Sequence, residues 1–297
     1  MLRAMITPEF SAYVAPARLY PQIWRLILGL LLILFIYAGF LALVMAGIMA
    51  YATPMGFFGW MLDLRDGTKP VPTLVMLFTF VGFGLGAIIT APACHYRSPG
   101  TLFGPFGETL RGFVLTVVIS LIFFSLLVTA LIFFDRPADN LPFQEWLKYL
   151  PYALPLLLIQ TASEEMVFRA YLPQQLAARF ASRFVWMLLP ALLFASLHWN
   201  PKLGVDAWLV VGATFVFALI STDLVVNTGS LGASMGLHFV NNIFALLVVS
   251  MDQTITGLSL FVTPMPDPGS WDFSVAMIVD LVALLILWRI LRFALSR

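Results

Sequence analysis

The chain has 297 residues, of which 61% are hydrophobic and only 10% are charged, whereas roughly a quarter of the residues in an average soluble domain are charged. This composition excludes a soluble globular protein and a disordered chain. The formal net charge of +1 gives no electrostatic reason to expect nucleic acid as a partner. The single cysteine, Cys94, excludes a disulfide framework and a zinc site built from cysteines.

The remaining class is an all-α, polytopic membrane protein. Residues 1–25 lack the compact apolar stretch of a cleavable signal peptide and predict a cytoplasmic or interfacial segment, with Tyr13, Tyr20 and Trp24 at the membrane surface. Residues 26–297 predict a single transmembrane domain of about eight helices. The predicted spans, with approximate ends, are 26–50, 73–90, 112–134, 146–158 with a polar extension, 184–199, 208–221, 232–250 and 273–288.

Loop charges predict the orientation of these spans. One alternate set of loops and ends is basic, with Arg3, Arg18, Arg25, Arg97, Arg111, Arg179, Arg183, Arg289, Arg292 and Arg297. The other set is neutral or acidic, with Asp63, Asp66, Asp135, Asp139, Glu145, Asp252, Asp267 and Asp272 beside four basic residues, Arg65, Lys69, Arg136 and Lys148. The positive-inside rule therefore places both termini in the cytoplasm. No internal repeat or inverted pair of interrupted spans, the usual transporter signature, is visible.

Ionisable groups at membrane depth are costly, so they are functional suspects. The segment Ser163-Glu164-Glu165-Met166-Val167-Phe168-Arg169 follows the uncharged run 149–163. At a helical spacing of i,i+4, Glu165 can pair with Arg169, whereas Glu164 points about 100° away and has no cation at i±3 or i±4. A structural ion pair explains Glu165 and Arg169 as well as a functional role does. It explains Glu164 less well, because a buried, unpaired carboxylate can act as a base near neutral pH.

Two of the three histidines also lie inside predicted spans. His198 is late in the fifth span beside Trp199, where an interfacial histidine is the simplest explanation if it is considered alone. His238 shares one face of the seventh span with Asn242 at i+4, and Asn241 is nearby. Interhelical hydrogen bonding would explain this second group if it is considered alone.

Five other residues receive structural interpretations. Asp280 lies inside the eighth span, where it pairs with a distant cation or lines a cavity. Asp223 and His95 are interpreted as loop residues. Gly232 and Gly236 form a small-xxx-small pattern that permits close helix packing.

Helix geometry connects the polar groups. The fourth and fifth spans form an antiparallel hairpin that turns near residues 181–182. Glu164 lies about 17 residues before this turn and His198 about 16 after it, so at about 1.5 Å per residue both lie at nearly the same depth. A carboxylate, two imidazoles and an amide together can activate water and stabilise an oxyanion.

The order and spacing of these residues resemble the three-motif signature of the CPBP family. The motifs are Glu-Glu-x-x-x-Arg at 164–169, Phe-x-x-x-His at 194–198 and His-x-x-x-Asn at 238–242. The family comprises type II CAAX prenyl proteases and bacteriocin-processing or self-immunity proteins. The resemblance covers about residues 146–250, and the spans outside this core carry no matching motif.

The resemblance implies an intramembrane glutamic endopeptidase without a cofactor. Glu164 would be the general base, helped by His198, and His238 and Asn242 would bind the oxyanion. Arg169 would organise the first motif, through Glu165. The residues themselves leave open which of the two adjacent glutamates is the base; Glu164 is preferred because Glu165 has its own cation at i+4.

Several alternatives remain at this point. A glutamate and the two histidines would suit zinc with water in a fourth position, although the sequence has no His-Glu-x-x-His helix and the resemblance favours a metal-free site. A non-catalytic scaffold or immunity protein of the same fold, and a proton-coupled transporter, are the other function classes. The expected partners are a peptide or protein substrate, with or without a lipid group, and the lipid bilayer. The expected location is the plasma (inner) membrane of a bacterium.

Overall fold

Five helices are long and apolar enough to cross a membrane. The computed structural model describes residues 7–134, 136–264 and 270–296. The five helices are α2 (Ile23–Tyr51), α4 (Pro70–His95), α5 (Phe106–Phe134), α9 (Ala207–Thr228) and α11 (Trp271–Leu295). These helices confirm the predicted all-α, polytopic membrane class.

The three remaining predicted spans also coincide with helical segments. They are α6 (Phe143–Glu165), a π-helical turn that continues into α8 (Leu189–Ser196), and α10 (Gly232–Ile243), which a second π-helical turn extends to Val248. The last two are shorter apolar helices, and α6 contains two prolines and several polar residues. The number of eight crossings stays a prediction.

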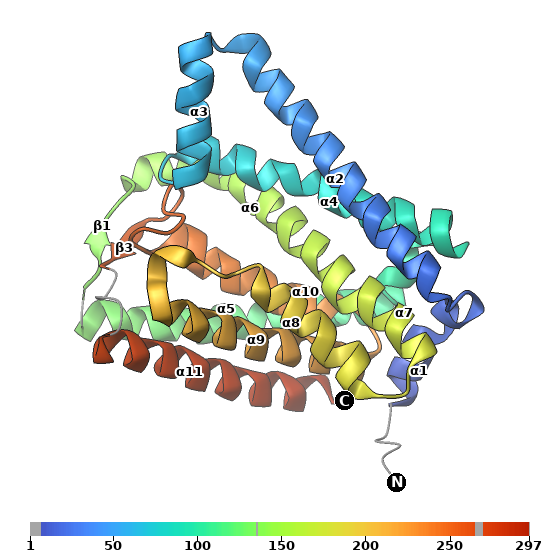
Figure 1. Ribbon diagram of the computed structural model, residues 1–297. Helices are drawn as coiled ribbons and strands as arrows, with labels where there is room; N and C mark the ends of the chain where they lie inside the picture. The colour runs from blue at the N-terminus through green and yellow to red at the C-terminus, as the bar shows by residue number, and fades with distance from the viewer. Residues whose placement is uncertain (1–6, 135, 265–269, 297) are drawn as a thin grey trace.

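The elements form two layers (Figure 1). Helices α2, α4 and α6 pack in sequence along one side, and α5, α9, α10 and α11 form the other, with α6 also contacting α10. A small sheet at one end has the strand order β1-β3-β2 (Ala138–Asp139, Phe261–Thr263, Val249–Met251). Short 3-10 helices cover Ala15–Leu19, Pro99–Leu102 and Pro201–Asp206.

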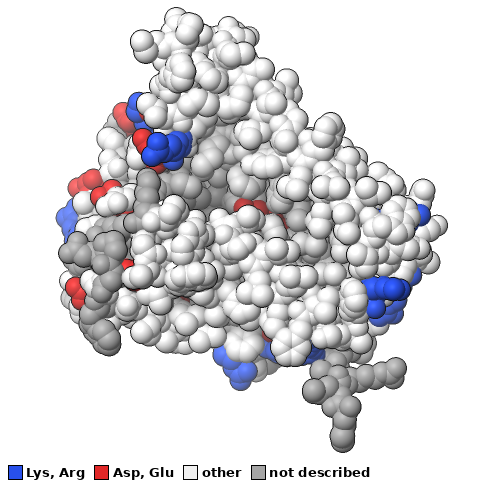
Figure 2. Space-filling model, viewed as in Figure 1, with Lys and Arg blue, Asp and Glu red and all other residues white. Residues whose placement is uncertain are grey.

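The charges separate along the bundle. Helix α1 (Pro8–Val14) and the C-terminal end of α11 lie at the end opposite the sheet (Figure 1). On the face shown in Figure 2, acidic atoms gather at the sheet end beside several basic ones, whereas the α1 end shows basic atoms. This distribution matches the loop-charge pattern, although the side of the membrane stays a prediction. Of the charges used for that pattern, Arg3, Asp135, Asp267 and Arg297 lie outside the described residues.

A helix replaces the loop expected between the first two spans. Helix α3 (Pro54–Asp66) begins with Thr53, whose hydroxyl accepts from the Gly56 N–H at 3.1 Å, and it ends at Gly67 with a φ of 63°. A threonine N-cap, proline in the first turn and a left-handed glycine after the last turn are helix boundary signals. Figure 1 shows α2 and α3 as an arm that projects from the bundle.

Asp223 lies inside α9 and not in a loop, because a partner helix satisfies its charge. Arg292 contacts both carboxylate oxygens at 2.9 Å, and Trp288 Nε1 donates to Asp223 at 2.9 Å. Both partners belong to α11, so the contact fastens α9 to α11. By contrast, Asp280 is exposed on α11, and no hydrogen bond or ion pair joins it to another described residue.

The N-terminal segment packs into the protein. Phe10 is fully buried, and Tyr13 is buried in the protein and not at the membrane surface as expected, because its hydroxyl donates to the Leu102 carbonyl. His95, interpreted as a loop residue, is instead the buried last residue of α4, and it contacts the Tyr171 hydroxyl at 2.8 Å. Helix α1 and the C-terminal end of α4 are therefore both packed inside the protein, through Tyr13 and His95 respectively.

A buried arginine stabilises this interface without a carboxylate partner. Arg97 donates to Gln174 at 2.6 Å and to Thr101 at 3.2 Å. Burial lowers the pKa of the Arg97 guanidinium to about 10. Gln174 belongs to α7 (Leu172–Arg179) and donates in turn to the Tyr13 carbonyl at 3.1 Å.

The glycines of α10 let α5 approach closely, as the small-xxx-small pattern predicts. A Cβ added at Gly232 would overlap the Thr109 carbonyl oxygen, and one at Gly236 would lie 2.9 Å from the Phe113 carbonyl oxygen. Backbone oxygens cannot move aside as flexible side chains can. The α5–α10 contact therefore depends on the absence of side chains at these positions.

We expect Gly232→Ala to lower the thermal unfolding temperature in detergent, with a cost of about 1–3 kcal/mol from overpacking. Gly212→Ala in α9 is the matched control, because a Cβ there would meet no atom within 4 Å. The unfolding temperature of the control should equal or exceed that of wild type, since alanine favours helices. Equal temperatures for both variants would contradict the close contact.

Candidate active site

The first motif lies where α6 changes its helical winding. Helix α6 ends at Glu165, and a π-helical turn, Met166–Tyr171, continues into α7. Pro173 cannot donate to the carbonyl four residues earlier, and its ring crowds that carbonyl, which favours a wider turn before it. The π turn before α8 likewise precedes Pro190. Such turns are frequent at functional sites because they redirect side chains.

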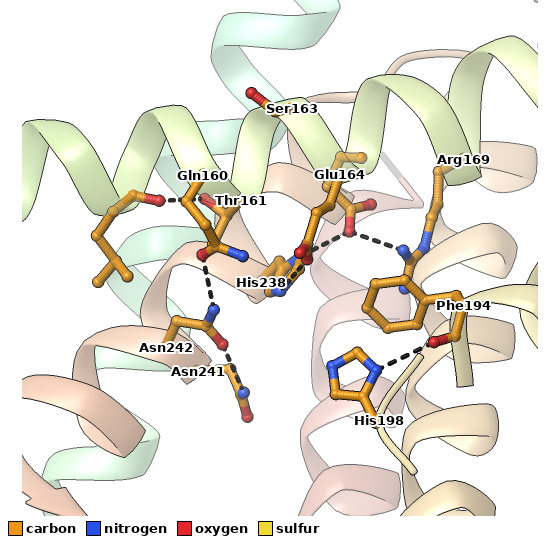
Figure 3. Close-up of polar contacts among 12 residues, drawn as sticks. Gln160, Thr161, Ser163, Glu164, Arg169, Phe194, His198, His238, Asn241 and Asn242 are labelled. Carbon is orange, nitrogen blue, oxygen red and sulfur yellow. Dashed lines mark hydrogen bonds and ion pairs between the residues drawn. The ribbon is translucent and has the colours of Figure 1, made fainter. Parts of the chain in front are cut away.

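Glu165 and Arg169 form the ion pair that their spacing predicts. Arg169 Nη1 lies 3.3 Å from Glu165 Oε1, and the two side chains are 1% and 0% exposed. Figure 3 shows Arg169 beside Phe194. A charge this deeply buried is tolerated only with a counter-charge and hydrogen bonds. The Glu165 carboxylate therefore interacts only weakly with solvent, because contacts within the protein bury it.

Helix α10 supplies the other partners of Glu165. Ser234 donates its hydroxyl to Glu165 Oε2, and His238 Nδ1 donates to Glu165 Oε1 at 2.8 Å. Ser234 and His238 are spaced i,i+4, so they lie on one face of α10. The contact with Glu165 orients the His238 ring through Nδ1. The other ring nitrogen, Nε2, lies 3.6 Å from Glu164 Oε2.

Aromatic rings enclose the Arg169 guanidinium. Its carbon lies 3.9 Å from the centre of the Phe194 ring and 5.9 Å from that of Phe217. The same two rings flank His238, with centroid distances of 6.0 and 5.3 Å. A cation on the face of an aromatic ring is attracted by the ring's quadrupole. Phe194, the first residue of the second motif, thus contacts the first and third motifs.

Glu164 has a different environment from its neighbour. Its side chain is 15% exposed, compared with 0% for Glu165, and among the described residues it forms no ion pair with an arginine or lysine. Figure 2 shows a hollow with acidic atoms at its floor, at the place where Figure 1 draws α6. Of the two carboxylates, Glu164 is the one that a water molecule or a substrate can reach.

His198 lies just beyond the end of α8, in the turn that follows Ser196, and not within the helix as expected. Its Nδ1 donates to the Phe194 carbonyl at 3.0 Å, which leaves Nε2 to accept a proton. Its ring packs against Phe194 with a centroid distance of 4.8 Å, and Figure 3 shows it below Phe194. Among the described residues, no direct contact joins His198 to Glu164.

Asn242, on α10, contacts α6 one helical turn before Glu164. Its Nδ2 donates to Gln160 Oε1 at 3.0 Å, and its Oδ1 accepts from Asn241 Nδ2 at 3.2 Å. Gln160 lies one turn before Glu164 on α6. The amide of Asn242 is therefore held by hydrogen bonds on both sides, and it is half-buried beside the hollow.

The structure brings most of the predicted site residues together. Glu164, Glu165, Arg169 and His238 form one connected group, Asn242 joins it through Gln160, and His198 joins it through Phe194. Within the described ranges, no cluster of three His, Cys, Asp or Glu side chains has the arrangement of a metal site.

Sequence reasoning missed Ser234, Phe217 and Gln160. The signal for two of them was present, because Ser234 precedes His238 by four residues and Gln160 precedes Glu164 by four. A polar residue one turn before a motif residue lies on the same helix face. Phe217 had no comparable signal, since an apolar residue in a span is not distinguished by its spacing.

Comparisons with known proteins agree with the region that carries the site. Residues 145–244 match a family model described as type II CAAX prenyl endopeptidase Rce1-like, and all the site residues above lie within them. The chain is 31% identical over 140 residues to the uncharacterized protein YyaK of Bacillus subtilis (strain 168). The aligned part is 46% of this chain and 46% of YyaK, so the match spans about half of that relative. No solved structure matches the chain. The family match confirms the resemblance of the three motifs.

Proposed function

We propose that the protein is an intramembrane endopeptidase of the glutamate type, because residues 145–244 match the family model of Rce1-like type II CAAX prenyl endopeptidases. The observation that carries the proposal is the unlike setting of two adjacent carboxylates. Glu165 is enclosed by Arg169, Ser234 and His238, whereas Glu164 is 15% exposed and, among the described residues, forms no ion pair with an arginine or lysine. Two titratable groups in unlike environments can take different roles in acid–base catalysis.

In the proposed reaction, Glu164 accepts a proton from a water molecule while the water oxygen attacks the carbonyl carbon of the scissile peptide bond. His198 assists through the nitrogen that its Phe194 contact leaves as an acceptor. The second N–H of the Asn242 amide donates to the oxyanion, joined by His238 Nε2 when that nitrogen carries a proton. The carbon–nitrogen bond then breaks, and the amine leaves with the proton from Glu164. The products are one new carboxylate and one new amine.

We propose a hydrophobic or lipidated peptide as substrate, because the site lies among apolar helices. A bacterial plasma membrane as location is supported by the relative from Bacillus subtilis. A non-catalytic scaffold or self-immunity protein is the second candidate. It is less favoured, because a scaffold does not need an accessible carboxylate that, among the described residues, has no arginine or lysine partner beside a buried ion pair.

The test is a cleavage assay in detergent with a prenylated CAAX peptide and a library of membrane-segment peptides, run in H₂¹⁸O. We expect cleavage to continue in the presence of a zinc chelator and to place one ¹⁸O atom in the new carboxylate, measured by mass spectrometry. Loss of cleavage on chelation, with recovery on adding zinc, would support the zinc alternative. Folded wild-type protein that cleaves no peptide would support the scaffold.

A further inference from the structure

Gln160 is a buried polar residue outside all three motifs. It is 7% exposed and lies in the C-terminal half of α6, one helical turn before Glu164. A glutamine amide has two N–H donors and one carbonyl acceptor, and each needs a partner when water is excluded. The partners of Gln160 therefore indicate what holds it in place.

The two ends of the amide face groups of the active site. Gln160 Oε1 accepts from Asn242 Nδ2 at 3.0 Å, and Glu164 follows Gln160 by one helical turn on the same face of α6. In Figure 3 the nitrogen side of the Gln160 amide faces Glu164 and the oxygen side faces Asn242. Glu164 supplies acceptor oxygens and Asn242 supplies donors, so the chemistry of both partners fixes this orientation.

The orientation of Asn242 follows from the same network. Its Oδ1 accepts from Asn241, so its Nδ2 must face Gln160. One N–H of Nδ2 is used by Gln160, and the second is left for an oxyanion. Rotating either amide by 180° would place two donors or two acceptors against each other, which costs the desolvation of both groups.

We propose that Gln160 is a positioning residue, which holds the base Glu164 and the oxyanion donor Asn242 at a fixed separation and in the reactive orientation. This inference rests on the proposed function. Gln160 acts through these two residues and bridges α6 and α10 at the point where the reaction takes place. Small displacements of reacting groups have large kinetic effects, because the reaction depends on their alignment.

The competing explanation is that Gln160 only joins two helices. The two explanations differ in kinetics. A positioning residue affects kcat through the residues that it holds, so removing Gln160 and Asn242 together gives a smaller loss of kcat than the product of the two single losses. A residue that only stabilises helix packing lowers the unfolding temperature, and its effects on activity multiply with those of Asn242.

The experiment uses Gln160→Met, which keeps the length and loses the amide, with Asn242→Ala and the double variant. The peptide is one that wild type cleaves. We expect Gln160→Met to lower kcat by about tenfold to a hundredfold, with KM changed by less than about threefold. The double variant should lose less kcat than the product of the two single losses. Gln160→Asn, which shortens the side chain by one methylene, should show the same loss of kcat. It provides the test if Gln160→Met does not fold.

Thr161→Val is the matched control on the next residue of α6. Thr161 is also fully buried, but its hydroxyl donates to the backbone carbonyls of Leu157 and Leu158 and not to the site. The control should retain the wild-type kcat. Wild-type kcat in Gln160→Met, or multiplying losses in the double variant, would overturn the inference while the proposed function stands. Wild-type cleavage by Glu164→Gln would show that Glu164 is not the base, which would overturn the inference; if folded Glu165→Gln also cleaves at the wild-type rate, the proposed function is overturned as well.

Discussion

Replacing Glu164 by Gln should lower kcat by about a hundredfold to ten-thousandfold, the range expected for loss of a general base. The amide has nearly the same size but cannot accept the proton of the attacking water. Because Glu164 is partly exposed and contacts only His238 among the charged side chains within 4 Å, the unfolding temperature should remain close to that of wild type. Both quantities are measured on the same detergent-purified sample, with initial rates of peptide cleavage and a thermal unfolding scan.

Glu145→Gln is the control for this change, since Glu145 is an exposed glutamate in the first turn of the same helix. It should leave both the rate and the unfolding temperature unchanged. A Glu164→Gln variant that cleaves at the wild-type rate, while Glu165→Gln is folded and inactive, would exchange the roles of the two glutamates.

Replacing Arg169 by Met should destabilise the protein by about 3–5 kcal/mol, the usual cost of leaving a buried charge without its partner. The Glu165 carboxylate would keep only Ser234 and His238 as partners while fully buried. Arg169→Lys should be less damaging than Met but worse than wild type. An ammonium keeps the charge, yet it cannot stack its planar group on Phe194 as the guanidinium does. The measurement is the unfolding temperature of each variant in detergent.

The double variant Glu165→Gln with Arg169→Met provides the control. Removing both charges leaves no unpaired ion, so the double variant should be more stable than Arg169→Met alone. If the two changes instead add, the ion pair is not the source of the destabilisation.

The sequence was sufficient to predict the membrane class and much of the site. Uncharged runs of sufficient length predict spans because the bilayer requires them. All eight predicted spans coincide with helical segments. The pairing of Glu165 with Arg169 followed from helix geometry alone. These features depend on local spacing, which a sequence displays directly.

The remaining features depend on contacts between distant segments. Asp223 lies in α9 and not in the predicted loop, and its counter-charge, Arg292 of α11, is 69 residues away in the sequence. The partner of His95, Tyr171, is 76 residues away, so no local pattern indicates that His95 is buried. Helix α3 is the exception, since Thr53, Pro54 and Gly67 mark its ends locally.

Helix α5 contributes no side chain to the site, yet it limits where His238 can lie. The backbone of α5 rests directly on Gly232 and Gly236, and Gly236 is only two residues before His238. Because backbone packs directly on backbone here, no flexible side chain can absorb a shift. The position of α5 therefore fixes the position of α10. A bulky lipid-side substitution on α5 would do little, whereas an added methylene on its inner face would move the imidazole relative to Glu164. Substitutions on the inner face of α5 should therefore alter turnover, although their effect reaches the site through the backbone of α10.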